Sequence, residues 1–382
     1  MKNVLILSYE FPPIIGGAGV YAHDLAIGLV KNGHRVSLLT YRSPENTDFL
    51  KRFAQQYQVT CYTIPNQKYL HFYLFFRQLK KLVKQQHYDT IIFSDARSKK
   101  MGTFFQASLK QLLSRSVSIF HGGEQNSFFD KPSFLLRTFG MKDKMLQFFM
   151  QQKKIVVVSR AEHEMWNKTS LKEKLHLITH GIDTDIFHRR NPAEIDAIKK
   201  RLGISSTRPI LLSASRLIKQ KGQEVVVEGL PEMVKALPDL LYIIVGGGPH
   251  QEVLEAMVNE RGLQKNVLFA GGVDRTVLSE YLAICDLFVL PSQFYESFGL
   301  VYLEAAACGK TAIAGNRGGT NEAIVDQVTG FLVNPVSKDE IIDKVLQVLQ
   351  DEQLRQNLQT SAFNRTVEEF SNVRMAEKLI NI

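Results

Sequence analysis

The chain has 382 residues, 45% of them hydrophobic and 22% charged, which is typical of packed globular proteins and unlike disordered, collagen-like or coiled-coil chains. Because a domain usually holds roughly 100–200 residues, this length predicts two or three domains. Three cysteines, Cys61, Cys285 and Cys308, lie far apart without a C-x-x-C spacing, which argues against a disulfide framework or structural zinc and indicates a reducing compartment.

The net charge of +9 is unevenly distributed along the chain. Residues 1–190 hold 28 Lys and Arg against 14 Asp and Glu, and the remainder holds 19 against 24. Residues 51–154 alone carry 18 basic and 5 acidic side chains, an excess that would attract a polyanion or an anionic lipid surface. No apolar run is long enough for a signal-peptide core or a membrane-spanning helix, so we expect a cytoplasmic protein.

Short β-rich runs alternate with amphipathic, helix-length segments, the pattern of βα units that build parallel sheets with helices on both faces. The first series of expected strands covers residues 4–8, 35–40, 59–64, 90–95, 117–121 and 155–159. The second covers residues 209–214, 240–245, 267–270, 287–290, 311–314 and 330–333. The sequence therefore predicts an α/β protein with two Rossmann-like, doubly wound domains that face a central cleft and are joined by a linker near 182–207. Ligands in this architecture bind outside the carboxyl ends of the strands.

After the first strand, Gly17-Ala18-Gly19 begins a match to the G-x-G-x-x-[GA] dinucleotide fingerprint. A dehydrogenase is disfavoured because residues 9–15 intervene between the strand and this motif, and because no ribose-binding acid ends the second strand. The loop instead delivers Gly16 and Gly17 to a helix start, where unpaired N–H groups can meet an anion. The alternative is a glycine turn that serves chain geometry alone.

Residues 69–86 predict a basic amphipathic helix, with Phe72, Phe75 and Leu79 on its apolar side and Arg77 and Lys80 among its cations. A second stretch, between residues 128 and 150, again mixes phenylalanines with lysines and arginines. We hypothesise that these surfaces dock on anionic lipid; packing against the N-terminal sheet with a solvated basic face is the alternative.

In the second half, Arg216 and Lys221 follow the strand at 209–214 and are candidates to clamp a diphosphate, although solvated loop cations show the same pattern. Further on, Glu296 precedes and Glu304 lies within a predicted helix, two carboxylates suited to sugar and ribose hydroxyls. The alternative is that Glu296 favours the helix dipole while Glu304 pairs with a cation.

At the start of the same predicted helix, the N–H groups of Phe298, Gly299 and Leu300 are expected to point toward the cleft. Asp183-Thr184-Asp185 matches a D-x-D metal motif but falls in the linker. Because Arg216 and Lys221 can supply the positive charge, we expect no metal or other cofactor.

Four motifs in order resemble family 4 of the retaining glycosyltransferases over nearly the whole chain. They are Phe-Pro-Pro-x2-Gly-Gly at 11–17, Ser-Arg-x4-Lys-Gly at 215–222, Glu-x7-Glu at 296–304 and Gly-Gly-x2-Glu-x7-Gly at 318–330. The first is most similar to the bacterial mannosyltransferase branch. Two departures from the family pattern bear on nucleotide preference: Asn321 lies where proline is common, and the run Gly246-Gly247-Gly248-Pro249 has glycine where an acid often lies.

The resemblance implies the GT-B fold, with an N-terminal domain at 1–185, a nucleotide-sugar domain at 186–370 and a last helix, about 371–382, that crosses back to the first domain. It also implies a role for each matching residue. Arg216 and Lys221 would hold the donor diphosphate, Glu304 the ribose, Glu296 and His121 the donor sugar, Val273 the base through its backbone, and Gly16 and Gly17 the donor phosphate and acceptor.

We therefore predict a metal-independent, retaining enzyme that moves a hexose from a nucleotide diphosphate sugar to an envelope glycolipid or glycan precursor. The first loop favours GDP-mannose, and UDP-sugars remain open. The alternatives are a sugar-nucleotide epimerase or phosphorylase on the same fold, and a non-catalytic membrane- or nucleic-acid-binding protein. For the enzyme we expect no nucleic-acid partner, and peripheral contact with the inner face of the cytoplasmic membrane is the associated hypothesis.

Overall fold

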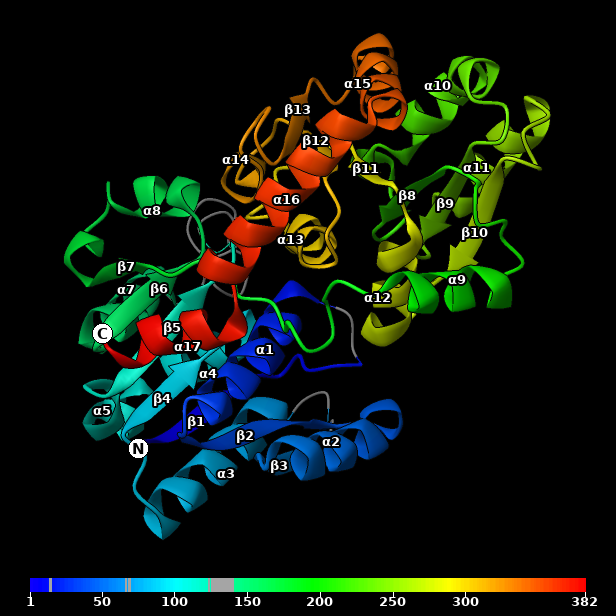
Figure 1. The fold of residues 1–382 in the computed structure, drawn as a ribbon. Helices are drawn as coiled ribbons and strands as arrows, with labels where there is room; N and C mark the ends of the chain where they lie inside the picture. The colour runs from blue at the N-terminus through cyan, green and yellow to red at the C-terminus, as the bar shows by residue number, and fades with distance from the viewer. Residues whose placement is uncertain (14–15, 66, 68–69, 123, 125–140) are drawn as a thin grey trace. The chain divides into compact units, whose positions relative to one another are not determined.

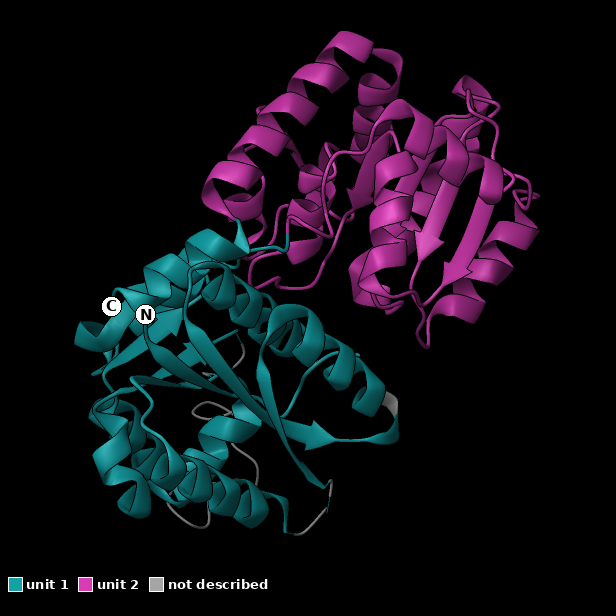
Figure 2. Cartoon of the chain, turned by 60° about the horizontal axis from the view of Figure 1, so that its bottom comes forward, with its two compact units in different colours: residues 1–183, 371–382 teal, residues 184–370 magenta. Residues whose placement is uncertain are grey.

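A computed structural model describes residues 1–13, 16–65, 67, 70–122, 124 and 141–382. The chain forms two compact units. Unit 1 comprises Met1–Asp183 with Ser371–Ile382, and unit 2 comprises Thr184–Phe370, as Figure 2 shows in teal and magenta. The break follows Asp183, whereas the sequence analysis places it between residues 185 and 186.

Unit 1 contains a seven-stranded parallel sheet in the order β3-β2-β1-β4-β5-β6-β7 (Figure 1). Its strands are β1 (Asn3–Leu7), β2 (Arg35–Arg42), β3 (Thr60–Pro65), β4 (Thr90–Phe93), β5 (Ser116–Phe120), β6 (Lys154–Val157) and β7 (Leu175–Leu177). Ile6 of β1 pairs in register with Leu38 of β2 and Ile92 of β4. The sequence predicts all of these strands except β7, whose three residues are too few to show a period-2 pattern.

The side chains of β1 alternate between two hydrophobic cores, one on each face of the sheet. Val4 and Ile6 pack in one core, and Leu5 and Leu7 pack in the other. Helices cover both faces: α1 (Gly17–Lys31), α2 (Pro44–Tyr57), α3 (His71–Gln85), α4 (Ala96–Phe104), α5 (Gln106–Leu113), α7 (Met141–Gln151), α8 (Arg160–Trp166) and α17 (Asn372–Ile380). Because both faces of the sheet are buried, the sequences of the strands are continuous apolar runs.

Helix α3 packs against the unit 1 core through its apolar side. Phe75, Leu79 and Leu82 are buried there, while Arg77 and Lys81 are exposed. The structure therefore favours the packing alternative for this apolar stripe. Of the second aromatic stretch, residues 128–139 lie outside the described residues, and Phe148 and Phe149 are fully buried core residues of α7. These two rings are not part of an exposed surface, contrary to the sequence-based hypothesis.

The last helix, α17, belongs to unit 1 although it follows unit 2 in sequence. Ser371 forms a β-bridge with Ile182, and the Asn372 N–H donates to the Ile182 carbonyl oxygen over 2.9 Å. Met375 and Leu379 are buried in the same core as Val4 and Ile6 of β1. Among the described residues, no helix is both long and apolar enough to cross a membrane.

Unit 2 contains a six-stranded parallel sheet in the order β10-β9-β8-β11-β12-β13. The strands are β8 (Ile210–Ala214), β9 (Leu241–Val245), β10 (Val267–Gly271), β11 (Leu287–Leu290), β12 (Ala312–Gly315) and β13 (Gly330–Val333). The helices are α9 (Pro192–Arg201), α10 (Gln223–Ala236), α11 (Gln251–Glu260), α12 (Arg275–Ile284), α13 (Leu300–Ala307), α14 (Thr320–Ala323), α15 (Lys338–Gln350) and α16 (Glu352–Glu369). The two units therefore have the two Rossmann-like sheets of the GT-B fold.

Candidate active site

Both sheets reverse their strand order next to their first strand. The reversal falls between β1 and β4 in unit 1 and between β8 and β11 in unit 2. In open α/β sheets, connections from neighbouring strands diverge at such a point and leave a ligand position outside the carboxyl ends. The loops that follow these four strands are therefore where candidate residues are best placed to act.

In unit 2, the loop after β8 is tied to the end of β11. Gly222 adopts a left-handed φ of +80° between the 3-10 turn Lys219–Lys221 and α10. A Cβ at this position would lie 2.1 Å from the Pro291 carbonyl oxygen, so only glycine fits. Gln293 N–H also donates to the Gln220 carbonyl oxygen over 2.8 Å. These contacts bring the Lys221 loop and the segment before Glu296 together.

Lys221 and Glu296, 75 positions apart in sequence, form an ion pair between Lys221 Nζ and Glu296 Oε1. Ser292 Oγ donates to the same carboxylate oxygen over 2.8 Å, and the Gly319 N–H donates to the Glu296 carbonyl oxygen over 2.7 Å. Both charged side chains remain partly accessible, at 18% and 15%. The structure thus joins two predicted site residues in a pair that a ligand can still reach.

Arg216 lies exposed on the same loop. Its backbone is held by the segment after β9: the Leu217 N–H donates to the Gly247 carbonyl oxygen over 3.0 Å, and the His250 N–H to the Leu217 carbonyl oxygen over 3.1 Å. Within the part of the chain that the structure describes, the Arg216 guanidinium has no ionic partner. It is therefore a cation on a fixed loop, available to an anion.

The helix α13 begins after Gly299, which has a φ of +93°. The Phe298 side chain anchors the helix start, because it is buried and packs edge-on against Phe370 with ring centroids 5.6 Å apart. The first N–H groups of α13, starting at Leu300, lack intrahelical acceptors, as at any helix start. Together with Glu296, they place polar groups at the end of β11.

Glu304 is buried on α13, and its Oε1 accepts from Arg275 Nη2 over 3.2 Å. Pairing with a cation was the alternative interpretation of Glu304, and the structure has this pair. The sequence analysis missed Arg275, which begins α12 and lies over the Phe187 ring. Val273 lies half-buried in the loop before α12.

In unit 1, the loop after β1 is held by Asp95 at the end of β4. One Asp95 carboxylate oxygen accepts from the N–H groups of Tyr9 and Glu10 over 2.6 and 2.9 Å, and the other caps α4. Burial, followed by the nearby Asp95 charge, raises the pKa of Glu10. A Cβ on Gly16 would lie 2.5 Å from Glu10 Oε2. An anion at this helix start must therefore compete with Glu10, whereas no described atom lies within 4 Å of a Cβ position at Gly17.

His121 follows β5, and its ring packs edge-on against Tyr21 and near His180, with centroids 4.9 and 5.9 Å away. Its Nε2 lies 2.8 Å from the Ser94 carbonyl oxygen. Burial, and then the neighbouring Lys99 charge, lowers the pKa of His121 to about 3. The imidazole is therefore neutral at physiological pH.

Behind His121 lies a buried charged cluster that the sequence analysis missed. Lys99 Nζ and Glu124 Oε1 are 2.7 Å apart, and the side chains are only 0% and 5% accessible. Burial, followed by the Glu124 charge, raises the pKa of the adjacent Glu162 to about 7, and Glu162 Oε2 accepts from Trp166 Nε1 over 3.1 Å. No short-range motif marks these residues, because they come from three different helices and loops.

The first aspartate of the D-x-D match lies inside unit 1, next to a lysine. Asp183 is fully buried, and its Oδ1 lies 3.7 Å from Lys31 Nζ within unit 1. Over the described residues, no group of three or more His, Cys, Asp or Glu side chains is placed to hold a metal ion.

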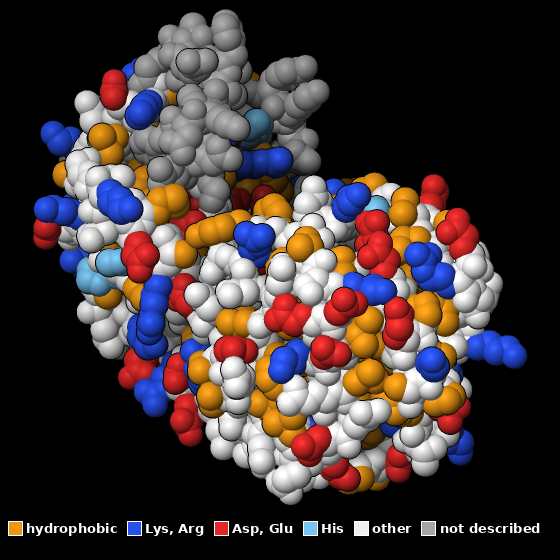
Figure 3. All heavy atoms as spheres, turned by 90° about the horizontal axis from the view of Figure 1, so that it is seen from above, with side chains coloured by type: hydrophobic (Ala, Val, Ile, Leu, Met, Phe, Trp, Pro, Cys, Tyr) orange, Lys and Arg blue, Asp and Glu red, His pale blue; other side chains and the backbone are white. Residues whose placement is uncertain are grey.

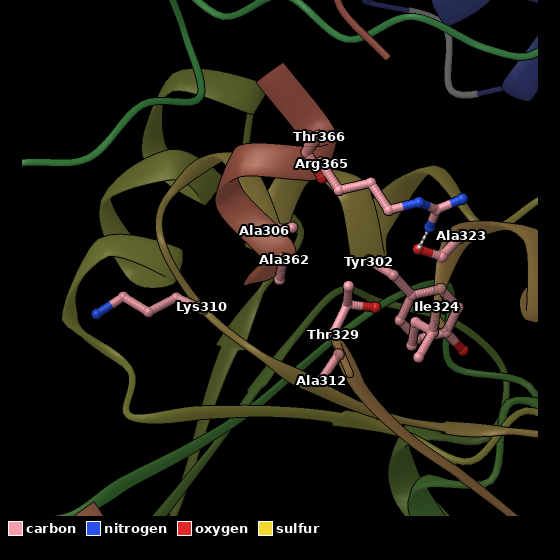
Figure 4. A pocket seen from close by; sticks show the side chains of 10 residues that line it. All are labelled: Tyr302, Ala306, Lys310, Ala312, Ala323, Ile324, Thr329, Ala362, Arg365 and Thr366. Carbon is pink, nitrogen blue, oxygen red and sulfur yellow. Dashed lines mark hydrogen bonds between the residues drawn. The ribbon is translucent and has the colours of Figure 1, made fainter. Parts of the chain in front are cut away.

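A cavity behind α13 does not qualify as a substrate site. It is lined by Tyr302 and by Thr366 of α16, and Arg365 closes one side by donating to the Ala323 carbonyl oxygen over 3.0 Å (Figure 4). Its volume of about 10 Å³ holds at most one water molecule.

On the surface shown in Figure 3, acidic and basic side chains are interspersed, without a large field of one sign.

Comparisons with known proteins match both units. Residues 15–186 match the family described as Glycosyltransferase Family 4, and residues 194–365 match the one described as Glycosyl transferases group 1. The chain is 26% identical, over its whole length and 97% of the relative, to a Corynebacterium glutamicum "GDP-mannose-dependent monoacylated alpha-(1-6)-phosphatidylinositol monomannoside mannosyltransferase". It is 28% identical to a related mannosyltransferase of Mycobacterium tuberculosis, with 92% of this chain and 90% of that one covered.

Among solved structures, the chain resembles the Anabaena protein Alr3699/HepE in complex with UDP and glucose. The TM-score is 0.79, the sequence identity is 21%, and the alignment covers 100% of this chain and 99% of the other. At this identity the likeness shows a common fold.

Proposed function

Because this chain belongs to the family 4 glycosyltransferases of the GT-B fold, in the mannosyltransferase branch, we propose that it is a retaining, metal-independent hexosyltransferase. Its donor is a nucleotide diphosphate sugar, with GDP-mannose preferred. Its acceptor is a hydroxyl group of an envelope glycolipid or glycan precursor.

The Lys221–Glu296 pair beside Arg216 is the observation that carries the proposal. In the proposed complex, the donor diphosphate displaces the carboxylate from the Lys221 ammonium, and the Arg216 guanidinium meets the same anion. Glu296 is then released to accept hydrogen bonds from sugar hydroxyls. A fork-shaped guanidinium and a mobile ammonium together neutralise a diphosphate without a metal ion.

The proposed reaction retains configuration at the sugar. The bond between the anomeric carbon and the diphosphate oxygen breaks, and the acceptor oxygen attacks from the same face. The departing phosphate oxygen takes the acceptor proton, giving a nucleoside diphosphate and a glycoside. In this scheme the protein supplies charge neutralisation and alignment, which are the larger contributions in group transfer of this kind.

GDP-mannose is proposed as donor because two relatives covering most of the chain are GDP-mannose-dependent enzymes by name. A thermal-shift panel with GDP, UDP and ADP tests this choice, because a ligand that binds only the folded state raises Tm by mass action. We expect the largest shift with GDP. The Arg216→Ala variant should lose that shift, and a larger shift with UDP would overturn the choice of nucleotide.

Transfer itself is tested with GDP-mannose and a phosphatidylinositol mannoside acceptor, the acceptor class in those relatives' names. NMR of the product should show the same anomeric configuration as the donor. Inversion would refute the retaining mechanism. Incubation with donor alone distinguishes the rival activity, because an epimerase would release an isomerised sugar nucleotide.

We also propose that unit 1 contacts the inner face of the cytoplasmic membrane through the exposed cations of α3, Arg77, Lys81 and Lys84. Flotation with vesicles containing anionic lipid should recover the protein at low salt and release it at high salt. The triple Gln variant of these cations should float less. The proposal would be contradicted if the variant and the wild type floated equally, or if the wild type did not float with the vesicles.

A further inference from the structure

The Lys99–Glu124 pair has no role in the proposed reaction, yet it lies directly against a site residue. Glu124 Oε1 accepts from Lys99 Nζ over 2.7 Å and from the His121 N–H over 3.1 Å. Lys99 Nζ also donates to the Ile119 carbonyl oxygen and lies 5.2 Å from the centre of the Phe120 ring. The pair therefore holds the backbone on both sides of Phe120, where β5 ends.

The His121 ring is held by a second set of contacts. Because a carbonyl oxygen can only accept, the 2.8 Å contact with Ser94 requires the proton to be on Nε2. Nδ1 is shielded from solvent and has no hydrogen-bond partner in the described part of the chain. A proton on Nδ1 would therefore be a buried, unpaired donor, which is costly.

The groups around the ring come from several elements. Tyr21 of α1 and His180 after β7 pack against it, the Lys99 charge on α4 acts on it electrostatically, and Glu124 accepts from its backbone N–H. Burial, followed by the neighbouring His121, lowers the pKa of His180 to about 3, and the Asp24 charge opposes this shift. Burial and the Lys99 ammonium both lower the pKa of His121. Geometry and charge thus favour one state of the ring.

We propose that Lys99 and Glu124 are positioning residues that fix His121 at the end of β5 and keep its imidazole uncharged, with the proton on Nε2. This inference rests on the proposed function, in which His121 contacts the donor sugar. An oxocarbenium-like transition state carries positive charge on that sugar. A neutral histidine does not oppose this charge, whereas an imidazolium would repel it.

The first test is independent of activity. Nitrogen-15 NMR of histidine-labelled, ligand-free protein, with the His121 signal assigned by its loss in His121→Phe, reports both tautomer and titration. We expect a protonated Nε2, an unprotonated Nδ1 and no titration above pH 5. A protonated Nδ1, or a titration above pH 5, would overturn the inference.

The second test changes the cluster. Lys99→Met removes the cation, and Lys99→Met/Glu124→Gln is made beside it because it removes both charges of the buried pair. Both variants should raise the pKa of His121, because each removes the Lys99 charge that lowers it. In each, kcat/KM should fall about tenfold at one pH unit below the new pKa and be less affected at higher pH. Lys110→Met, an exposed cation of α5, is the matched control and should leave the pH profile unchanged.

A merely structural role predicts a different result, in which the variants lower kcat/KM equally at every pH. That result, or an unmoved His121 titration in a folded variant, would refute the positioning role. Absence of sugar transfer by the wild type would instead refute the proposed function, and the NMR test would still decide the state of the ring.

Discussion

The two sheets reverse strand order in the same way, yet their charged groups have opposite surroundings. In unit 2, Lys221 and Glu296 form a pair that is 18% and 15% accessible, next to the exposed Arg216. In unit 1, Lys99 and Glu124 form a pair that is 0% and 5% accessible, behind His121. An accessible pair can exchange partners with a ligand, whereas a buried pair cannot leave its partner without a large desolvation cost. This difference in accessibility is the basis of the two roles that we propose, ligand binding for the first pair and positioning for the second.

The sharpest test of this comparison removes Arg216, the exposed arginine on the same loop as Lys221. Arg216→Ala should lower kcat/KM by roughly 10²–10³ without lowering Tm, because its charge is needed only when the diphosphate departs. Steady-state kinetics and calorimetry measure the two effects. Lys219→Ala, an exposed cation of the same loop, is the control and should stay near wild-type activity. Full activity of Arg216→Ala would place the anion elsewhere.

The two ion pairs should also differ in stability. Lys99→Met should lower the free energy of unfolding by about 3–5 kcal/mol, because it removes the ammonium from a buried ion pair. Lys221→Met should change it by less than about 1 kcal/mol, since water still reaches Glu296. Urea titrations at pH 7 compare the variants. Equal effects would show that burial does not distinguish the two pairs.

A third prediction concerns the pH dependence of unit 1 stability. The raised pKa of Glu162, about 7, means that the folded chain keeps a proton that the unfolded chain loses above its ordinary value of 4.5. Stability from this group is therefore lost as pH rises from 4.5 to 7, by roughly 3 kcal/mol in total. Glu162→Gln should remove this loss while retaining an acceptor for Trp166.

The free energy of unfolding of Glu162→Gln is compared with that of the wild type at each pH. His121 and His180 titrate in the opposite sense: their lowered pKa values mean that stability is lost as pH falls from 6.5 toward 3. Both proteins contain these two histidines, so their contribution cancels when one free energy of unfolding is subtracted from the other. A difference that does not grow between pH 5 and pH 8 would contradict the assignment to Glu162.

The smallest expected effect is that of chelation. If Arg216 and Lys221 neutralise the diphosphate in unit 2, EDTA should leave kcat unchanged, within about twofold. The assay needs metal-free donor and acceptor, and added Mg²⁺ or Mn²⁺ serves as the converse arm. Loss of activity in EDTA that is restored by either ion would refute metal independence.

The positions along the chain of all strands but β7, and the placement of Arg216, Lys221 and Glu296 after strands, could be predicted from the sequence. These features depend on local periodicity and on the short distance between each strand and the loop that follows it. Glu304 was also placed on its helix correctly, but its partner Arg275, 29 positions earlier, carries no local signal. Likewise, the apolar stripe of α3 was visible, but the sequence did not reveal what it packs against.

The sequence by itself determined the two-sheet architecture and singled out the residues that we propose as anion ligands, because both follow from patterns within a few tens of residues. Only the tertiary structure decided which charged side chains are buried and which side chains they pair with. Lys99 pairs with Glu124 across 25 positions of sequence, and burial raises the pKa of the adjacent Glu162. Desolvation depends on the whole packed surroundings, so no stretch of sequence shows it.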